Sequence, residues 1–166
     1  MTRTTIALAC IVASAAAGLT ACGQDTSTAT RAVPQAQEVT RASFETFGDH
    51  VVHFNAQSTT MLPAEVARAF GIRRSGNRAM LNVTVLRRGD AGSDTPVTAE
   101  VVVNATNLLG QQKDVSVREL REGEAIYYIG EVPVANEEII TFSISVRPEG
   151  TARPHVIQFR QQFYTD

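Results

Sequence analysis

The three histidines are the residues of this sequence best suited to hold a metal ion or to transfer a proton. His50 and His53 stand three residues apart in a stretch where apolar and polar residues alternate. Such alternation predicts a strand, on which residues three apart point to opposite faces. The two imidazoles therefore cannot share a metal ion, and His155 lies far along the chain. We expect neither a metal site nor a cofactor.

Nucleophilic catalysis is not indicated either. A reactive serine needs a base beside it, and in many hydrolases it stands in a Gly-x-Ser-x-Gly turn. The sequence has no such turn and no glycine-rich phosphate loop. No histidine adjoins the serines in predicted turns and strands, which are Ser58, Ser75, Ser93 and Ser116.

Two pairs of carboxylates are the remaining candidates for acid–base chemistry. They are Glu122 with Glu124, and Glu137 with Glu138. Both pairs stand at the ends of predicted strands, where we expect solvated turns. The sequence therefore predicts a protein that is not an enzyme.

Cys22 is the residue for which a specific modification is predicted. It follows Leu19, Thr20 and Ala21, at the end of an apolar run over residues 6–19 that Arg3 precedes. A run of about 14 apolar residues fits a signal peptide and is shorter than the roughly 20 that cross a membrane. The alternative is an ordinary secretory signal with a cysteine near its cleavage site.

The arrangement around Cys22 resembles the lipobox of bacterial lipoproteins. This resemblance implies a diacylglyceryl group on Cys22, cleavage after residue 21 and acylation of the new amine. Two or more acyl chains anchor a protein stably to a membrane. Gly23 follows the cysteine in place of the aspartate that would imply retention at the inner membrane. We therefore expect a lipid-anchored protein on the periplasmic face of the outer membrane.

The cysteine count and the net charge exclude further kinds of site. Cys10 and Cys22 are the two cysteines of the chain. The first leaves with the signal and the second carries lipid, so a thiol nucleophile, a thiolate zinc site or a redox pair is excluded from the mature domain. The formal net charge of −2 gives no attraction to nucleic acid.

Residues 22–42 are rich in Thr, Ser, Ala and Gln and contain few large apolar residues. Such a segment cannot bury enough apolar surface to form a core. It is expected to be a flexible tether with a random-coil span of roughly 25 Å.

The folded domain is expected over residues 43–166, where apolar residues recur with period two. About seven strands are predicted, over residues 50–56, 81–85, 97–105, 115–117, 125–132, 140–146 and 157–163. Their short connections favour antiparallel pairing. One helix of about eight residues is expected after Pro63, with Val66 and Phe70 packing it against a sheet edge and Gly71 ending it.

The predicted fold is an all-β, immunoglobulin-like antiparallel sandwich with one short helix. The tryptophan and cysteine pair of true immunoglobulin domains are absent. Tyr127 and Tyr128 are neighbours on one strand, so one is expected in the core and the other on the surface.

Four arginines, Arg68, Arg73, Arg74 and Arg78, lie within eleven residues and have no acid between them. The planar guanidinium binds carboxylate and phosphate with two hydrogen bonds. This segment is a candidate contact for an anionic partner, such as a lipid headgroup, peptidoglycan or an acidic protein face. The alternative is that Arg68 faces solvent and the others pair with acids of the chain itself.

Five runs of residues resemble the uncharacterised DUF4426 family of gammaproteobacteria. They are VVHFN (51–55), FGIRRS (70–75), ATNLLGQ (105–111), REGEAIYYI (121–129) and FRQQFY (159–164). The resemblance covers the chain from about Ser43 onward and implies a small exported domain. It supplies no catalytic residue to carry over.

These observations favour a non-enzymatic envelope lipoprotein that is an interaction or accessory module for an envelope protein or polymer. The alternative is a periplasmic carrier of a small ligand or metal. A carrier is expected to have a buried polar pocket. An interaction module is expected to have an exposed apolar patch or a long unpaired sheet edge.

The lipid anchor gives a first prediction. Cys22→Ser removes the thiol that accepts the diacylglyceryl group, so the variant should be uncleaved or soluble and should carry no labelled acyl chain. Metabolic labelling with palmitate and membrane fractionation measure this. Palmitate uptake by the serine variant, together with outer-membrane fractionation, would contradict the lipobox.

Overall fold

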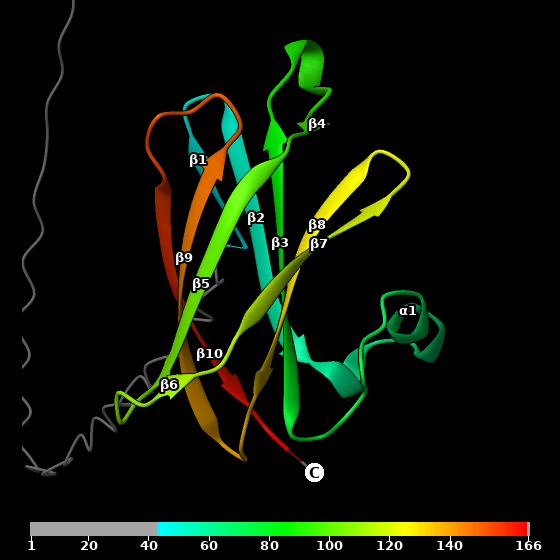
Figure 1. The fold of residues 1–166 in the computed structure, drawn as a ribbon, viewed down its shortest axis with the longest axis vertical. Helices are drawn as coiled ribbons and strands as arrows, with labels where there is room; N and C mark the ends of the chain where they lie inside the picture. The colour runs from blue at the N-terminus through cyan, green and yellow to red at the C-terminus, as the bar shows by residue number, and fades with distance from the viewer. Residues whose placement is uncertain (1–42, 166) are drawn as a thin grey trace, which may run out of the picture. The chain divides into compact units, whose positions relative to one another are not determined.

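The computed structural model describes residues 43–165, so the predicted signal, Cys22 and the predicted tether lie outside the described residues. Two antiparallel sheets face each other in this part of the chain (Figure 1). The all-β sandwich predicted from the alternation is therefore confirmed. Among the described residues, no helix is long and apolar enough to cross a membrane.

The first sheet has the strand order β1-β2-β3-β8-β7, and β4 also pairs with β3. Its strands are β1 (Phe44–Phe47), β2 (His50–Ser58), β3 (Arg78–Arg87), β4 (Thr95–Pro96), β7 (Ser116–Glu122) and β8 (Ala125–Pro133). The second sheet has the order β10-β9-β5-β6. Its strands are β5 (Ala99–Asn107), β6 (Gln112–Lys113), β9 (Glu138–Pro148) and β10 (His155–Phe163). Each of the seven expected strands coincides with one of these.

The three strands that the alternation missed are short. β1, β4 and β6 have four, two and two residues, too few for a periodic pattern to stand out. Two 3-10 turns, η1 (Thr59–Met61) and η2 (Asp90–Gly92), complete the described elements together with the helix α1 (Ala64–Ala69). The helix has six residues rather than about eight, and Pro63 precedes its first turn.

The core lies between the sheets because every second side chain of each strand points inward. The two sheets contribute facing sets of branched and aromatic side chains that are almost fully buried. These include Val52, Leu81, Val83, Val85, Val132, Ile140, Phe142, Ile144, Val146 and Ile157. Burial of this apolar surface is the main contribution to the stability of the fold.

A second, smaller cluster covers the outer face of the first sheet. Leu62, Ala67 and Ile72, from the connection between β2 and β3, pack on Met80 of β3 and Ile129 of β8. The helix therefore packs on the face of the sheet, and the expectation that it anchors to the edge is wrong. The physical reason is that β3 and β8 carry apolar side chains on both faces, so the outer face also needs a cover.

Tyr127 and Tyr128 point to opposite faces of β8, as expected from strand geometry. Tyr128 is buried in the main core. Tyr127 lies on the outer face of the first sheet, as predicted, but it is only partly exposed there. The β2–β3 connection covers that face, and the Tyr127 ring lies 6.0 Å from that of Phe70.

A hydrogen-bonded chain joins the two sheets at one side of the sandwich. The Ala99 N–H of β5 donates to the Tyr128 hydroxyl over 2.7 Å. That hydroxyl donates in turn to Glu119 Oε2 of β7 over 3.1 Å. Burial raises the pKa of the Tyr128 hydroxyl, the Ala99 N–H opposes the rise and the Glu119 charge adds to it. The hydroxyl therefore keeps its proton and remains a donor at neutral pH.

Gly130 of β8 lies where Val115 packs closely against the first sheet. A Cβ at this position would stand 2.9 Å from Val115 Cγ1, closer than real Cβ contacts. Valine is stiff about χ1, so it cannot swing aside cheaply. The absence of a side chain at residue 130 is thus what lets the segment before β7 pack on the core.

We therefore expect Gly130→Ala to lower the free energy of unfolding by about 1–3 kcal/mol through overpacking. Val115→Ala in the same chain should restore part of the loss, because it removes the clashing methyl groups. Chemical denaturation of the two single variants and the double variant measures the coupling. Additive losses in the double variant would contradict the close approach.

Candidate functional site

The connection between β5 and β6, which we call the leucine turn (residues 107–111), is the most elaborately hydrogen-bonded turn of the second sheet. The Gly110 N–H donates to the Asn107 carbonyl, and the Asn107 N–H donates to the Gln111 carbonyl, both over 3.0 Å. Gly110 has a φ of +77°, as a three-residue hairpin loop with a glycine at its last position requires. The backbone of the leucine turn is therefore closed by its own bonds.

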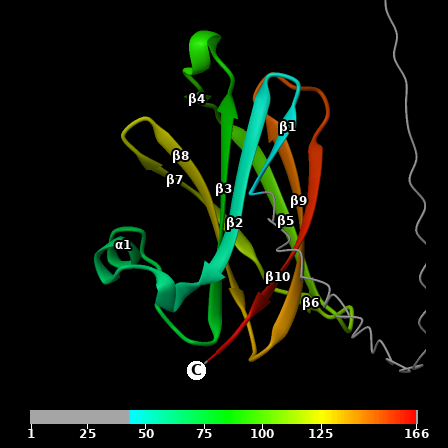
Figure 2. The same cartoon turned by 180° about the vertical axis from the view of Figure 1, so that it is seen from behind.

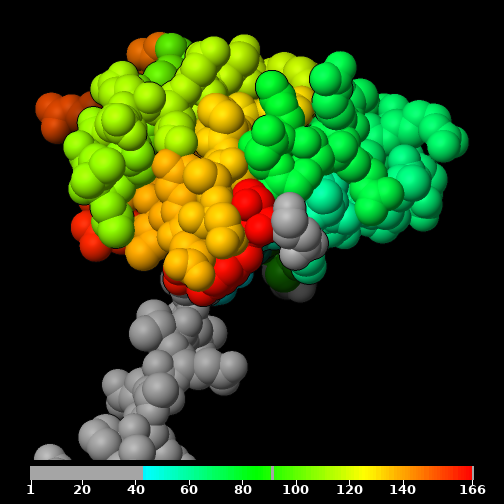
Figure 3. Space-filling model, turned by 90° about the horizontal axis from the view of Figure 1, so that it is seen from below, coloured from blue at the N-terminus to red at the C-terminus, as the bar shows by residue number. Residues whose placement is uncertain are grey.

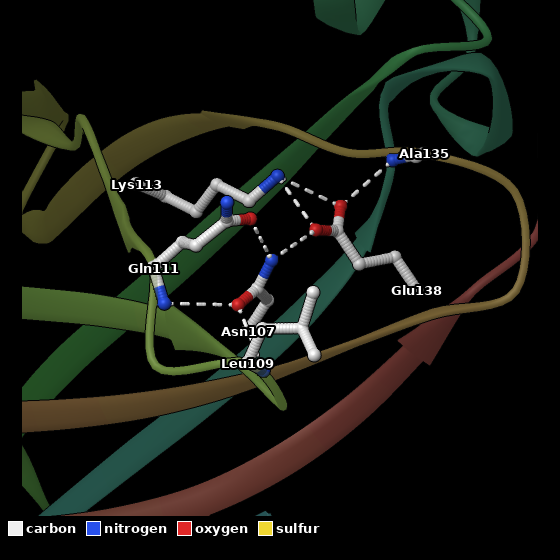
Figure 4. Close-up of polar contacts among 6 residues, drawn as sticks. All are labelled: Asn107, Leu109, Gln111, Lys113, Ala135 and Glu138. Carbon is white, nitrogen blue, oxygen red and sulfur yellow. Dashed lines mark hydrogen bonds and ion pairs between the residues drawn. The ribbon is translucent and has the colours of Figure 1, made fainter.

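The Asn107 side chain holds this turn from within (Figure 4). Its Oδ1 accepts the N–H groups of Leu109 and Gln111, each over 3.0 Å. Its Nδ2 donates to Gln111 Oε1 over 2.8 Å and to Glu138 Oε1 over 3.2 Å. Asparagine commonly stabilises turns through such local side-chain bonds.

Glu138, at the start of β9, fixes the base of the turn. Its carboxylate forms an ion pair with Lys113 Nζ at 2.7 Å, with the two side chains only 13% and 19% exposed. It also accepts the Ala135 N–H over 2.9 Å. Burial alone would raise the pKa of Glu138, but the bonds from Lys113, Ala135 and Asn107 outweigh it and hold the pKa below the ordinary value. The sequence-based expectation that Glu138 belongs to a solvated turn is wrong, whereas its neighbour Glu137 is exposed.

Leu108 and Leu109 occupy the two corner positions of this turn and point into solvent. Their exposed fractions are 64% and 84%, and neither belongs to a core cluster. The turn extends sideways from the sandwich at the end that also holds the C-terminus (Figures 1 and 2). Figure 3, seen from this end, shows the yellow-green β5–β6 segment at the rim of the surface. Polar residues and glycine are usual at turn corners, so two leucines here are unexpected.

A second feature is the free edge of β10. This nine-residue strand pairs with β9 on one side, and no strand of residues 43–165 pairs with its other side. Val156 and Gln158 are exposed, with 63% of Val156 accessible. Val102 of β5 is also exposed and, like Val156, pairs in register with Ser145 of β9. The outer face of the second sheet therefore carries an exposed valine on each side of Ser145.

An open hollow lies between the start of β5 and the end of β9. Its volume is about 440 Å³, and its walls include Thr98, Glu100, Arg147 and Thr151. Glu100 and Arg147 form an ion pair across neighbouring strands. Glu149 also lines the hollow, which therefore carries one carboxylate beyond the Glu100–Arg147 ion pair.

The four predicted arginine residues are distributed over the β2–β3 connection and the start of β3. Arg78 forms an ion pair with Glu131 at 3.1 Å, and Arg74 donates to the Thr60 carbonyl over 2.9 Å. Arg68 and Arg73 are exposed, and their side chains make no hydrogen bond or ion pair with the described residues. Two of the four guanidinium groups are thus engaged within the domain, and binding of an anionic partner by this segment stays a prediction.

His50 and His53 lie on opposite faces of β2, as the strand assignment predicted. His50 is buried and its Nδ1 lies 2.9 Å from Asp49, whereas His53 is exposed on the opposite face of β2. His155 stacks on Phe47 with ring centroids 4.3 Å apart. Among residues 43–165, no three His, Cys, Asp or Glu side chains gather in an arrangement that could hold a metal ion.

Comparison with known proteins identifies the family. The model for a domain of unknown function, DUF4426, matches residues 44–166. The chain belongs to the DUF4426 family. The resemblance noted in the five sequence runs is thereby confirmed, and the matched range coincides with the sandwich.

A DUF4426 family protein from Pseudomonas aeruginosa PAO1 has a crystal structure similar to this chain. The two are 29% identical, with a TM-score of 0.63 over 74% of this chain and 94% of the other. The yeast GGA1 GAE domain matches 72% of this chain and 95% of its own, at 10% identity and a TM-score of 0.36, which is too low to support an argument. No functionally curated protein matches the chain.

Two of the DUF4426 runs coincide with the features described above. ATNLLGQ contains the whole leucine turn, and FRQQFY forms the second half of β10 and the residue after it. The arginine segment, which is the candidate predicted from the sequence, is separate from both the leucine turn and the edge of β10. The exposed leucines were visible in the sequence as apolar residues in a predicted turn, but the free edge of β10 required the strand order.

The partly buried Glu138 carboxylate gives a testable pH dependence. Its pKa is lowered on folding, so its contribution to stability is present above the unfolded pKa and is lost as pH falls through the folded pKa. Glu138→Gln should lower the free energy of unfolding at pH 7 by about 2 kcal/mol, since Lys113 loses its partner. The difference between variant and wild type should shrink near about pH 3, where the carboxylate of the unfolded chain is protonated.

Denaturation curves at the two pH values measure both effects. Glu137→Gln is the matched control, because that side chain is exposed and its substitution should change stability by less than about 0.5 kcal/mol. Equal losses at pH 7 and pH 3 would contradict the assigned role of the Glu138 charge.

Proposed function

We propose that this DUF4426 protein is a non-enzymatic, lipid-anchored envelope protein whose sandwich is an interaction module. Its partner is an extended segment of another envelope protein, which adds as a strand to the free edge of β10. The observation that carries this proposal is that no strand of residues 43–165 pairs with β10 on the side opposite β9. Strand addition of this kind supplies affinity through backbone hydrogen bonds and specificity through alternate side chains.

The composition of β10 supports an edge that accepts a strand. Stable monomeric domains protect their edges with charges, proline, bulges or very short strands. The edge strand β7 follows this rule, since Arg118, Glu119, Arg121 and Glu122 are four of its seven residues. β10 has nine residues, contains no proline or lysine, and carries Arg160 as its one permanent charge. The edge strands β7 and β10 therefore differ in the protection they carry.

The outer face next to this edge is also suited to recognition. Ser143, Ser145 and Thr141 follow one another along the outer face of β9, and Val102 and Val156 flank the row at Ser145. An added strand would place its alternate side chains beside Val156 and Gln158. These uncharged neighbours favour a partner segment with small or apolar residues on that face.

The lipid anchor and the signal come from the sequence and remain part of the proposal. A lipid on Cys22 holds the domain at the membrane, where an interaction module meets other envelope components at high effective concentration. The alternative function is a periplasmic small-ligand carrier. The hollow lined by Glu100 and Arg147 is the observation that favours it, with a volume inside the range of ligand sites.

Site-specific photocrosslinking in intact cells tests the proposal. A photoreactive amino acid at Gln158 of β10 should give one adduct of defined mass. The same amino acid at Ser116 of β7 is the matched control and should give none, because that edge is charged. Val156→Lys should reduce the adduct at residue 158 several-fold, since a lysine beside an edge opposes strand addition.

The outcomes separate the candidate functions. Equal adducts at residues 158 and 116, or no adduct at 158, would overturn binding at β10. An adduct at Arg73 instead would move the contact to the arginine segment. An adduct of twice the chain's own mass would identify a second copy in place of another protein. A small molecule retained in stoichiometric amount by the purified protein, and lost in Arg147→Ala, would favour the carrier.

A further inference from the structure

The two leucines of the leucine turn are unexplained by the fold and by binding at β10. They lie outside both core clusters and are the most exposed pair of neighbouring apolar residues in the described chain. The turn needs Asn107 and Gly110 for its geometry, but its hydrogen bonds involve no leucine side chain. The fold therefore does not require leucine at residues 108 and 109, and these side chains can have a function in binding.

We propose that the leucine turn inserts Leu108 and Leu109 into the surface of the bilayer that carries the lipid anchor. The ligand class is the boundary between phospholipid headgroups and acyl chains. This inference rests on the lipid-anchored location in the proposed function. It does not depend on what binds to β10.

The turn presents its leucines on a rigid base. Asn107 closes the turn through four hydrogen bonds, and the ion pair between Lys113 and Glu138 fixes the strands beneath it. An apolar tip that is already ordered loses little conformational entropy when it binds. Two adjacent leucines at the corners of a closed turn thus form a preorganised apolar projection.

The surroundings of the tip fit insertion between lipid headgroups. Gly110, Gln111 and Gln112 are exposed and uncharged. The nearest cation along the chain, Lys113, is paired with Glu138, and the exposed Asp114 follows it. Residues 108–112, which form the tip and its flank, carry no charge that must leave water when the tip enters the boundary. Binding should therefore depend on apolar burial and only weakly on anionic lipid.

The predicted chain length from the anchor allows the contact. Ser43 follows Cys22 by 21 residues, which reach at most about 75 Å when fully extended. A nine-residue strand such as β5 is about 30 Å long, so either end of the sandwich can approach the membrane. Tethering of this kind gives effective concentrations near the millimolar range, so a tip of modest affinity is sufficient.

A bilayer suits this shape better than a protein pocket does. The leucine turn is a convex projection at the rim of the domain (Figure 3), with two side chains at successive corners. A fluid bilayer surrounds any convex apolar shape, whereas a protein pocket needs a matching concave surface for both leucines. The observations therefore favour lipid as the partner of the tip.

Tryptophan fluorescence tests this proposal directly, because the chain contains no tryptophan. The mature lipidated protein carrying Leu109→Trp is reconstituted into vesicles of phosphatidylcholine, and in parallel into vesicles of brominated phosphatidylcholine. The indole emission should shift to the blue and lose about half its intensity in the brominated vesicles, because quenching requires burial near the acyl chains. Leu108→Ser in the same chain should weaken the quenching, since it removes half of the apolar tip.

Met61→Trp is the matched control. Met61 is 73% exposed and precedes α1, which lies on the other side of the sandwich from β6 (Figures 1 and 2). Its indole should show the emission of an exposed tryptophan in both kinds of vesicle. Replacing part of the lipid with phosphatidylglycerol should leave the quenching at residue 109 nearly unchanged.

The outcomes distinguish failure of this inference from failure of the proposed function. Vesicle-bound protein whose indole at residue 109 is quenched no more than the control overturns tip insertion alone. Protein that does not float with the vesicles at all contradicts the lipid anchor, on which both proposals depend. A blue shift that appears in cell envelopes but not in pure lipid vesicles identifies a protein pocket and overturns the bilayer as partner.

Discussion

The hydrogen bonds of the Tyr128 hydroxyl help to fix how the two sheets, which pack through apolar contacts, lie relative to each other. Apolar packing is proportional to buried area and is not directional, so two sheets can slide a little without losing it. The hydroxyl binds the first residue of β5 on one side and Glu119 of β7 on the other. This fixes where β5 enters the second sheet, and hence where its far end, at Asn107, leaves it. The position of the leucine turn relative to the first sheet depends on this connection together with the hydrogen bond from the Val97 N–H to the Val85 carbonyl of β3.

The alternation in the sequence predicted the seven long strands because each has one face in the main core. It gave no information on the cover of the first sheet, since apolar residues on both faces are expected of any central strand that is buried on both sides. β8 is central, between β3 and β7, but Ile129 and Tyr127 also face a separate cluster formed by the β2–β3 connection. A pattern of period two reports that a face is buried, and it does not report what buries it.

The candidate sites could be predicted from the sequence less completely than the fold could. Glu138 was expected in solvent because it stands at the end of a predicted strand. Its partner Lys113 lies 25 residues away, and a pairing of that range depends on which strands become neighbours. The edge of β10 is likewise a property of strand order rather than of any residue. The leucine turn is an exception, because the sequence already shows Leu108 and Leu109 within a recognisable turn. The structure adds that both side chains are exposed.

The order of the strands along the chain has a consequence for how the domain is made. β9 and β10 are the last strands among the described residues, and they supply Ile140, Phe142, Ile144, Val146 and Ile157, all fully buried. A chain that emerges with its N-terminus first, from a ribosome or a translocation pore, therefore exposes the inner face of its first sheet until the final strands arrive. The core is completed only when β9 and β10 have emerged, so until then the chain stays loosely folded and depends on protection from aggregation.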